Sequence, residues 1–491
     1  MNPLAQLSGV DDLEVVRRSV VAADGNTFVL VQRDDSRFVL VLGDSSGFEG
    51  EDHGPSGGRL CPLTPSTLAR LRRRLPWLQP VPLGLRTSFG FGDRLGLATP
   101  GHIQSIRHTR GGTDRIAPVF AQQSVRENSR TGRTPRRVMD DAAWAVFEHG
   151  WRAPWGADAD HLKVPDDVSD FADAGFTFFT IDPGDHVDDD VDGTHLEAKV
   201  HDLPWGSLED SLDDLERRFL SSPFDLEGTA VPFDRASLWG AAAKYGRAVD
   251  HTAQMYHHIA ATMADRPFEL EVSVDETDTP TSVSEHIYIA SELRRLGVRW
   301  VSLAPRFVGR FEKGVDYIGD LEEFSQQFAL HAAVARQMGP YKLSLHSGSD
   351  KFSIYPIASR LTNRKSRSPG PLVHVKTAGT SFLEALRAVA LLDQDLFRSV
   401  LEVARSRYER DRVTYHVSAD LSRVPRPENL DDAGLEDLFE QFDAREVLHV
   451  TFGSILDRYG DRIRATLVRN EQAYADVLRS HFTKHLADFA Q

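Results

Sequence analysis

The chain has 491 residues, of which 41% are hydrophobic and 26% are charged. These values are ordinary for a globular protein, and the length suits one large domain with appendages or two to three domains. The formal net charge is −16. Because a phosphate backbone attracts a broad basic surface, this charge predicts a protein that does not bind nucleic acid.

Cys61 is the only cysteine, so no disulfide within the chain and no thiolate zinc cluster can form. The first residues show no basic segment followed by an apolar one, which a secretory signal would have. No stretch approaches the roughly 18 consecutive apolar residues of a membrane helix. We therefore expect a cytoplasmic protein with no membrane partner.

Residues 1–80 are expected to form a small N-terminal α+β domain. Within it, residues 28–43 (FVLVQRDDSRFVLVLG) have two β-rich halves around an Asp-Asp-Ser turn, which is typical of a β-hairpin. We place Cys61 in a loop of this domain, where nothing supports a role as a thiol nucleophile.

Residues 81–410 contain eight short β-rich runs, each of which ends in polar residues. The runs are 88–96, 116–124, 155–163, 176–183, 268–276, 299–307, 342–350 and 372–380. Helical patterns separate several of them, at 166–175, 284–297, 321–339 and 382–408. Strands that alternate with helices favour a parallel sheet, and eight of them predict a (β/α)8 TIM-type barrel. A doubly wound open sheet is the main alternative.

Two further segments lie outside this count. Residues 184–265 are too long for one crossover after the fourth strand, so we interpret them as an insertion that could cap the barrel. Residues 411–491 form a C-terminal extension.

Two short motifs suggest ligands but fail on their spacing. GFGDRLG (90–96) has its third glycine one position late for a dinucleotide-binding loop. DDDVDG (188–193) begins like a calcium-binding loop, but Lys199 stands where the bidentate glutamate is needed. We therefore interpret the first motif as a turn and the second as an acidic loop.

Three histidines, His161, His346 and His374, lie at the ends of predicted strands. In a TIM barrel the carboxyl ends of the strands form the active site, so these side chains are expected to meet. Neutral imidazole is a common ligand of divalent transition ions, and three ligands with an open position suit catalysis. The sequence thus predicts a divalent metal cation (zinc, manganese, nickel, cobalt or iron). Simple hydrogen-bonded histidines at strand ends are the alternative.

Carboxylates and cations also recur at the strand ends. On the fifth predicted strand, Glu271 and Asp275 share one face by the period of two, and this face is expected to point inward because helices bury the other. Further carboxylates are Asp93, Asp160, Asp182 and Glu276, and the cations are Lys163, Arg306, Lys351 and Lys376. The cations suit a substrate that carries a carboxylate, although structural salt bridges are expected for about half of the acids.

Six segments together resemble the tagaturonate epimerase family, over about residues 85–420. They are GFGDRLGLATPGHI (90–103), GADADHLK (156–163), EVSVDETDTPTS (271–282), SLAPRFVG (302–309), LHSGSDKFSIYPIA (345–358) and HVKTAGTS (374–381). The resemblance implies a metal-dependent enzyme of hexuronate catabolism that interconverts D-tagaturonate and D-fructuronate. It implies His161, His346 and His374 as metal ligands and Asp160 as proton acceptor.

Strand position adds further candidates to this set. From its strand and face we predict Glu271 as the proton donor. The predicted substrate-binding residues are Lys163, Asp182, Arg306 and Lys376.

The chemistry of this conversion limits the mechanism. The inverted carbon is β to the ketone, so simple enolisation does not make its hydrogen acidic. Retro-aldol cleavage needs a base for the hydroxyl and a Lewis acid for the carbonyl, and we favour it over direct removal of the proton. A metal-dependent ketose isomerase or aldolase, or a non-catalytic barrel that binds sugar acids, would use similar residues. The sequence does not indicate the oligomeric state.

Overall fold

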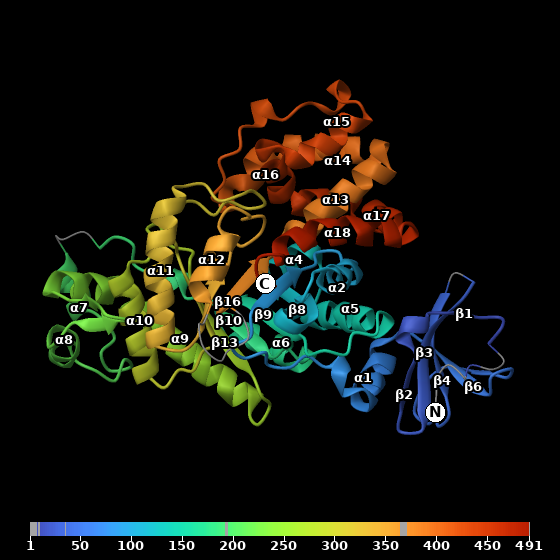
Figure 1. Ribbon diagram of the computed structural model, residues 1–491, viewed down its shortest axis with the longest axis horizontal. Coiled ribbons are helices and arrows are strands. Elements are labelled where there is room, and N and C mark those ends of the chain that lie inside the picture. Colours follow the sequence, from blue (N-terminus) through green and yellow to red (C-terminus); the bar gives the residue numbers. More distant parts are fainter. Residues whose placement is uncertain (1–6, 8–9, 35, 192–194, 364–370, 491) are drawn as a thin grey trace.

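The computed structural model describes residue 7 and residues 10–34, 36–191, 195–363 and 371–490. Its centre is a closed barrel of eight parallel strands (Figure 1). In barrel order the strands are β7 (Ser88–Gly92), β8 (Ala117–Ser124), β9 (Gly156–Leu162), β10 (Phe178–Ile181), β13 (Glu269–Val274), β14 (Ser302–Pro305), β15 (Lys342–Leu345) and β16 (Val373–Thr377). Each lies within one of the eight predicted runs. The TIM-type barrel is confirmed, and the open-sheet alternative is wrong.

Helices follow most of the strands and cover the outside of the barrel (Figure 1). They are α2 (Thr99–His108), α3 (Gly112–Arg115), α4 (Val125–Thr131), α5 (Pro135–Glu148), α6 (Val168–Ala174), α10 (Val283–Arg295), α11 (Leu321–Gln337), α12 (Tyr355–Thr362) and α13 (Thr380–Leu392). The predicted helix at 382–408 is in fact two, because α14 (Gln394–Asp411) begins anew after Asp393. The Asp393 carboxylate accepts a hydrogen bond from the Leu396 N–H at 3.0 Å and so caps α14.

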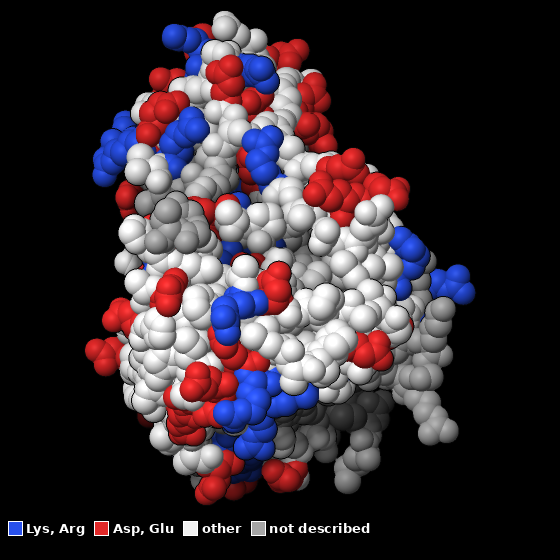
Figure 2. Space-filling view, turned by 90° about the vertical axis from the view of Figure 1, so that its left-hand side faces the viewer, with Lys and Arg blue, Asp and Glu red and all other residues white. Residues whose placement is uncertain are grey.

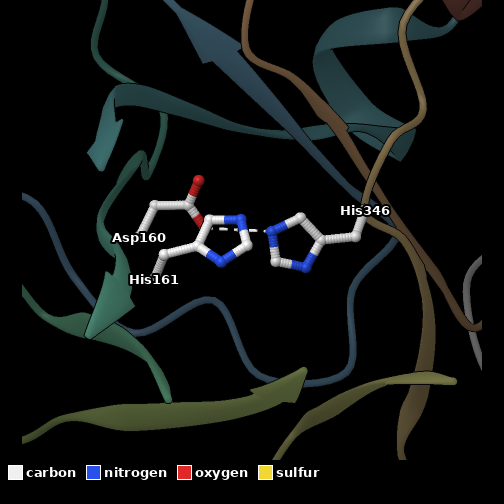
Figure 3. A group of neighbouring side chains, drawn as sticks. All are labelled: Asp160, His161 and His346. Atoms are coloured by element: carbon white, nitrogen blue, oxygen red, sulfur yellow. Dashed lines mark ion pairs between the residues drawn. The ribbon is translucent and has the colours of Figure 1, made fainter. Parts of the chain in front are cut away.

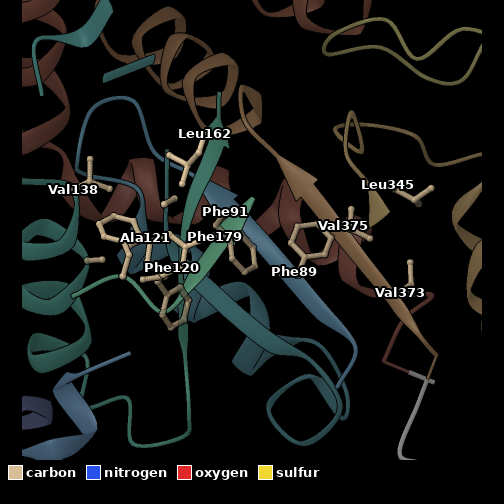
Figure 4. Close-up of a cluster of buried hydrophobic side chains, with 14 of the residues drawn as sticks. Phe89, Phe91, Phe120, Ala121, Val138, Leu162, Phe179, Leu345, Val373 and Val375 are labelled. Atoms are coloured by element: carbon tan, nitrogen blue, oxygen red, sulfur yellow. The ribbon is translucent and has the colours of Figure 1, made fainter. Parts of the chain in front are cut away.

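Alternation along the strands separates an apolar outer face from a polar inner one. On β13, Leu270 and Val272 are buried in the hydrophobic core, whereas Glu271 on the opposite face contacts Lys376 inside the barrel. Figure 4 shows the apolar side chains of several neighbouring strands gathered under the helices. The expected inward direction of the carboxylate face of β13 is therefore confirmed.

The N-terminal region forms an antiparallel sheet at one end of the molecule (Figure 1). Its strands are β1 (Glu14–Val15), β2 (Val21–Ala23), β3 (Asn26–Arg33), β4 (Ser36–Leu42), β5 (Glu51–His53) and β6 (Gly58–Pro62), followed by α1 (Pro65–Arg74). Strands β3 and β4 pair antiparallel and confirm the predicted hairpin. Cys61 lies on β6 and not in a loop, and burial raises the pKa of its thiol to about 11.

The segment between β10 and β13 contains α7 (Leu196–His201), α8 (Leu212–Leu220), a small hairpin of β11 (Phe224–Leu226) and β12 (Thr229–Val231), and the long helix α9 (Arg235–Met263). We expected an insertion that could cap the barrel. Helix α9 packs against α6 and α10 in the outer layer of helices, and a capping role for the rest of the segment stays a prediction.

The C-terminal extension is helical. After α14 come α15 (Asp432–Asp437), α16 (Phe442–Val450), α17 (Phe452–Arg469) and α18 (Glu471–Leu486), and α18 packs on α2 and α13. Among the described residues, none of the helices is both long and apolar enough to cross a membrane. Acidic and basic side chains are interspersed over the face drawn in Figure 2, where the described residues form no broad basic area.

Candidate active site

Strand β9 ends in a β-bulge that turns two consecutive side chains, Asp160 and His161, toward the barrel mouth. Consecutive residues of a regular strand point to opposite faces. Here His161 has a φ of 53°, and the register between β9 and β10 shifts between Phe179 and Ile181. Bulges of this kind are frequent beside active sites. Figure 3 shows Asp160 and His161 close to His346.

His346 follows β15 and completes a group that we call the mouth cluster: Asp160, His161 and His346. The centroids of the two imidazole rings lie 4.3 Å apart, and His346 Nε2 is 3.3 Å from Asp160 Oδ1. One possible ligand atom of each residue lies within 4.8 Å of the other two. Because β9 and β15 are not neighbours in the barrel, these side chains converge across its mouth.

The third expected metal ligand, His374, lies deeper in the barrel and outside the mouth cluster. In the strand register it is opposite Ser344 and Ser88, two residues below the level of His346. Its Nδ1 atom is 2.8 Å from Ser88 Oγ. Lys376 stands two residues nearer the mouth on the same face of β16.

Lys376 is buried among three carboxylates that line the barrel interior. Its Nζ atom lies 2.7 Å from Asp158 Oδ2, 2.7 Å from Asp160 Oδ1 and 3.0 Å from Glu271 Oε1. It also donates a hydrogen bond to Thr180 Oγ1 at 2.6 Å. Burial, together with Asp160 and Glu271, raises the pKa of Asp158 to about 7, so Asp160 and Glu271 supply most of the negative charge beside the mouth cluster at neutral pH.

These charges set the protonation of the site. Burial alone would raise the pKa of Asp160, but Lys376 and the imidazoles outweigh it and hold this pKa well below its usual range. Burial alone would also raise the pKa of Glu271, but Lys376 and nearby imidazoles outweigh it and lower this pKa to about 2. Burial would lower the pKa of His161, but Asp160 and Asp182 raise it to about 9. Asp160 and Glu271 are therefore ionised at neutral pH.

Asp182 and Lys163 lie on the rim beside His161. Asp182 Oδ2 is 3.0 Å from His161 Nδ1 and 3.6 Å from Lys163 Nζ. Lys163 Nζ is also 2.9 Å from Asp185 Oδ1. A carboxylate at Nδ1 orients the ring and leaves Nε2 for a ligand, an arrangement common behind metal-bound histidines. Lys163 is thus paired with carboxylates of its own chain, and its substrate contact stays a prediction.

A cavity of about 380 Å³ adjoins the mouth cluster, with His346 in its wall. Arg306, which follows β14, also lines the cavity, and its contact with a substrate stays a prediction. Sequence reasoning missed other lining residues, namely Arg126, Arg310, Lys313, Tyr415 and His416. They lie on a short helix, in a long loop and in the C-terminal extension, where no strand-end pattern marks them.

The donor atoms of the mouth cluster fit a divalent transition ion. Imidazole nitrogen and carboxylate oxygen are ligands that such ions prefer. Both ring nitrogens of His346 are buried and make no hydrogen bond within the described part of the chain. The nearby carboxylates add the negative charge that favours a cation.

Comparison with known proteins identifies the family. The family model described as tagaturonate epimerase matches residues 16–489. The chain belongs to the tagaturonate epimerase family. A member from Thermotoga maritima, named tagaturonate/fructuronate epimerase, is 41% identical over 482 residues and covers 96% of each chain.

Solved structures of fructuronate-tagaturonate epimerase from Cohnella laeviribosi have the same fold. The native structure is 35% identical, with a TM-score of 0.90, and the alignment covers 99% of this chain and 98% of that chain. The complex with one glycerol is 35% identical, with a TM-score of 0.89 over 97% and 96% of the two chains. The family model also covers most of the N-terminal sheet and the insertion, which contain none of the six segments that carry the resemblance.

Proposed function

We propose that this protein is an isomerase, a divalent-metal-dependent epimerase that interconverts D-tagaturonate and D-fructuronate. One observation carries the proposal: a member of the tagaturonate epimerase family brings Asp160, His161 and His346 together beside a cavity at the barrel mouth. The substrates are those in the names of its relatives from Thermotoga maritima and Cohnella laeviribosi.

The mouth cluster supplies the ligands of the metal in this proposal. His161 and His346 would hold the ion through nitrogen and Asp160 through Oδ1, so the deeper His374 is not needed. When bound there, the ion supplies Lewis-acid chemistry that polarises the ketone oxygen. Zinc, manganese, nickel, cobalt and iron all suit these donor atoms.

Asp160 is the base. Its contacts with Lys376 and His346 both use Oδ1, so we assign Oδ2 as the atom that accepts the hydroxyl proton on the carbon β to the ketone. The bond between the α and β carbons then breaks, which gives an aldehyde and an enediolate. The aldehyde turns, the bond forms again on its other face, and Asp160 returns the proton to the new alkoxide.

Glu271 is ionised before the reaction begins, so it does not start as the proton donor that the sequence predicted. Its pKa is lowered to about 2, so it can give a proton only after it has received one. The Lys376 ammonium contacts both Asp160 and Glu271, which allows a proton to pass between the two carboxylates. We assign Glu271 as the group that shares this proton and keeps Lys376 in place.

The direct test is to remove metal from the purified protein, incubate it with D-tagaturonate and restore divalent ions one at a time. We expect D-fructuronate to form only after an ion is restored. The reverse reaction from D-fructuronate should show the same requirement. Absence of turnover with every ion would overturn the proposal, and full turnover without metal would overturn the metal dependence.

A further inference from the structure

The loop between β14 and α11 places three cationic side chains in the wall of the cavity: Arg306, Arg310 and Lys313. Arg310 is neutralised, since its Nη1 atom lies 3.2 Å from Glu312 Oε1. Arg306 and Lys313 are half-buried, and neither forms an ion pair with a carboxylate of the residues that the structure describes. The wall also contains the carboxylates of Asp275 and Glu276, but among the described residues neither of them forms an ion pair with Arg306 or Lys313.

The ammonium group of Lys313 has a defined position beside the mouth cluster. It donates a hydrogen bond to Ser347 Oγ at 2.6 Å, and Ser347 directly follows His346. One hydrogen bond uses only one of the three donors of an ammonium group. Lys313 thus keeps donors for a ligand that reaches the mouth cluster.

A second lysine fixes the loop that carries Lys313. Lys351 was expected at the mouth, but it is buried, and its Nζ atom donates to the carbonyl oxygens of Glu312 at 2.8 Å, Val315 at 2.5 Å and Ser349 at 2.9 Å. The Glu312 carboxylate also accepts from Ser418 Oγ at 2.7 Å. The loop is therefore held from both sides, so its cationic groups are in place before a ligand binds.

We propose that Lys313, together with Arg306, binds the carboxylate of the substrate and is the residue that selects a sugar acid over a neutral ketose. This rests on the proposed function. Only one carbon separates the inverted centre of a hexuronate from its carboxylate, so the anion must bind close to the mouth cluster. After cleavage the carboxylate stays on the aldehyde fragment, and an anchor there retains this fragment while its aldehyde group turns.

The experiment compares Lys313→Met with the full-length wild-type protein on D-tagaturonate and on D-tagatose, which lacks the carboxylate. Loss of one charge-assisted hydrogen bond is expected to raise KM for D-tagaturonate by roughly 10- to 100-fold with a smaller change in kcat. Any activity on D-tagatose should be unchanged. Lys313→Arg, which keeps the charge, should restore most of the affinity for D-tagaturonate.

Lys484→Met, at an exposed lysine of α18, is the matched control for removal of one positive charge. Thermal melting of each variant separates misfolding from loss of binding. If Lys313→Met misfolds, Lys313→Gln, which removes the charge but keeps a polar group, takes its place with the same expected rise in KM for D-tagaturonate. Unchanged KM in Lys313→Met, or equal losses on both sugars, would overturn the inference. If the wild type does not epimerise D-tagaturonate, calorimetric binding of D-galacturonate to wild type and Lys313→Met decides the carboxylate subsite separately, and equal affinities would overturn it.

Discussion

The Nζ atom of Lys376 lies 2.7 Å from Oδ1 of Asp160, and both side chains are buried. Lys376 stands on β16 and Asp160 on β9, two strands that are separated by β7 and β8 in the barrel. The pair therefore spans the barrel interior and links the buried charges to the mouth cluster. It bears on the stability of the fold and on the reactivity of the proposed base.

Replacing Lys376 with methionine leaves the carboxylates of Asp158, Asp160 and Glu271 in the barrel without their shared cation. We expect the free energy of unfolding of the metal-free protein to fall by about 3–5 kcal/mol, as is usual when one partner of a buried ion pair is removed. Urea denaturation measures this change, with Lys484→Met as the surface control. A loss below about 1 kcal/mol, as for an exposed pair, would show that the pair is not important for stability.

Metal affinity distinguishes the mouth cluster from the deeper histidine. His346→Ala removes a proposed ligand and should weaken binding of a divalent ion by on the order of 100-fold or more. His374→Ala should leave the affinity nearly unchanged, because this ring lies two residues below the cluster and bonds Ser88. Titration calorimetry on the metal-free proteins measures both constants. Equal losses in the two variants would restore His374 to the ligand set.

Most strands of the barrel were predictable because the alternation of inward- and outward-facing residues along a strand can be followed in the sequence itself. Along β13 the order of Glu271, Val272 and Ser273 already assigns each residue to the inner or outer face. The depth of His374 was not predictable in this way. It depends on the stagger between β15 and β16, which pairs His374 with Ser344 and leaves His346 beyond the end of the ladder.

The site itself depends on local departures from regular structure. His161 reaches the mouth only because its backbone takes a φ of 53°, and the sequence ADADHLK does not predict this conformation. Lys351 follows a strand end as an active-site cation would, yet its ammonium group bonds three carbonyl oxygens of neighbouring loops. Lys313 lies in an irregular loop, and only the folded chain brings it beside Ser347.

The pH dependence of stability should reveal a pair of carboxyl groups at the C-terminal extension. Glu446 on α16 and Glu312 both accept hydrogen bonds from the Ser418 N–H, at 3.1 Å and 2.8 Å. Burial, reinforced by Glu312, raises the pKa of Glu446 to about 8. The folded protein therefore retains a proton that the unfolded chain releases near pH 4.5, and stability falls as the pH rises from there through 8.

Glu446→Gln tests this relationship because the amide, like the protonated carboxyl, can donate a hydrogen bond to Glu312. Its free energy of unfolding should be close to that of the wild type at pH 5 and exceed it at pH 8. The wild-type slope due to this group is at most about 1.4 kcal/mol per pH unit. Urea denaturation at several pH values measures both curves. Parallel curves would mean that Glu446 is ionised throughout.

Isotope exchange tests whether the base Asp160 removes the hydroxyl proton, as in retro-aldol cleavage, or whether the hydrogen on the inverted carbon is removed directly. In retro-aldol cleavage the hydrogen on the inverted carbon stays with the aldehyde, so D-fructuronate formed in deuterium oxide should carry no deuterium at that carbon. Direct removal of the proton would place solvent deuterium there, and nuclear magnetic resonance of the product tells the two apart. Asp160→Asn cannot accept the hydroxyl proton and should lower kcat by roughly 100- to 10,000-fold. Deuterium at the inverted carbon would exclude the bond-cleavage route, since that carbon keeps its hydrogen at every step of it.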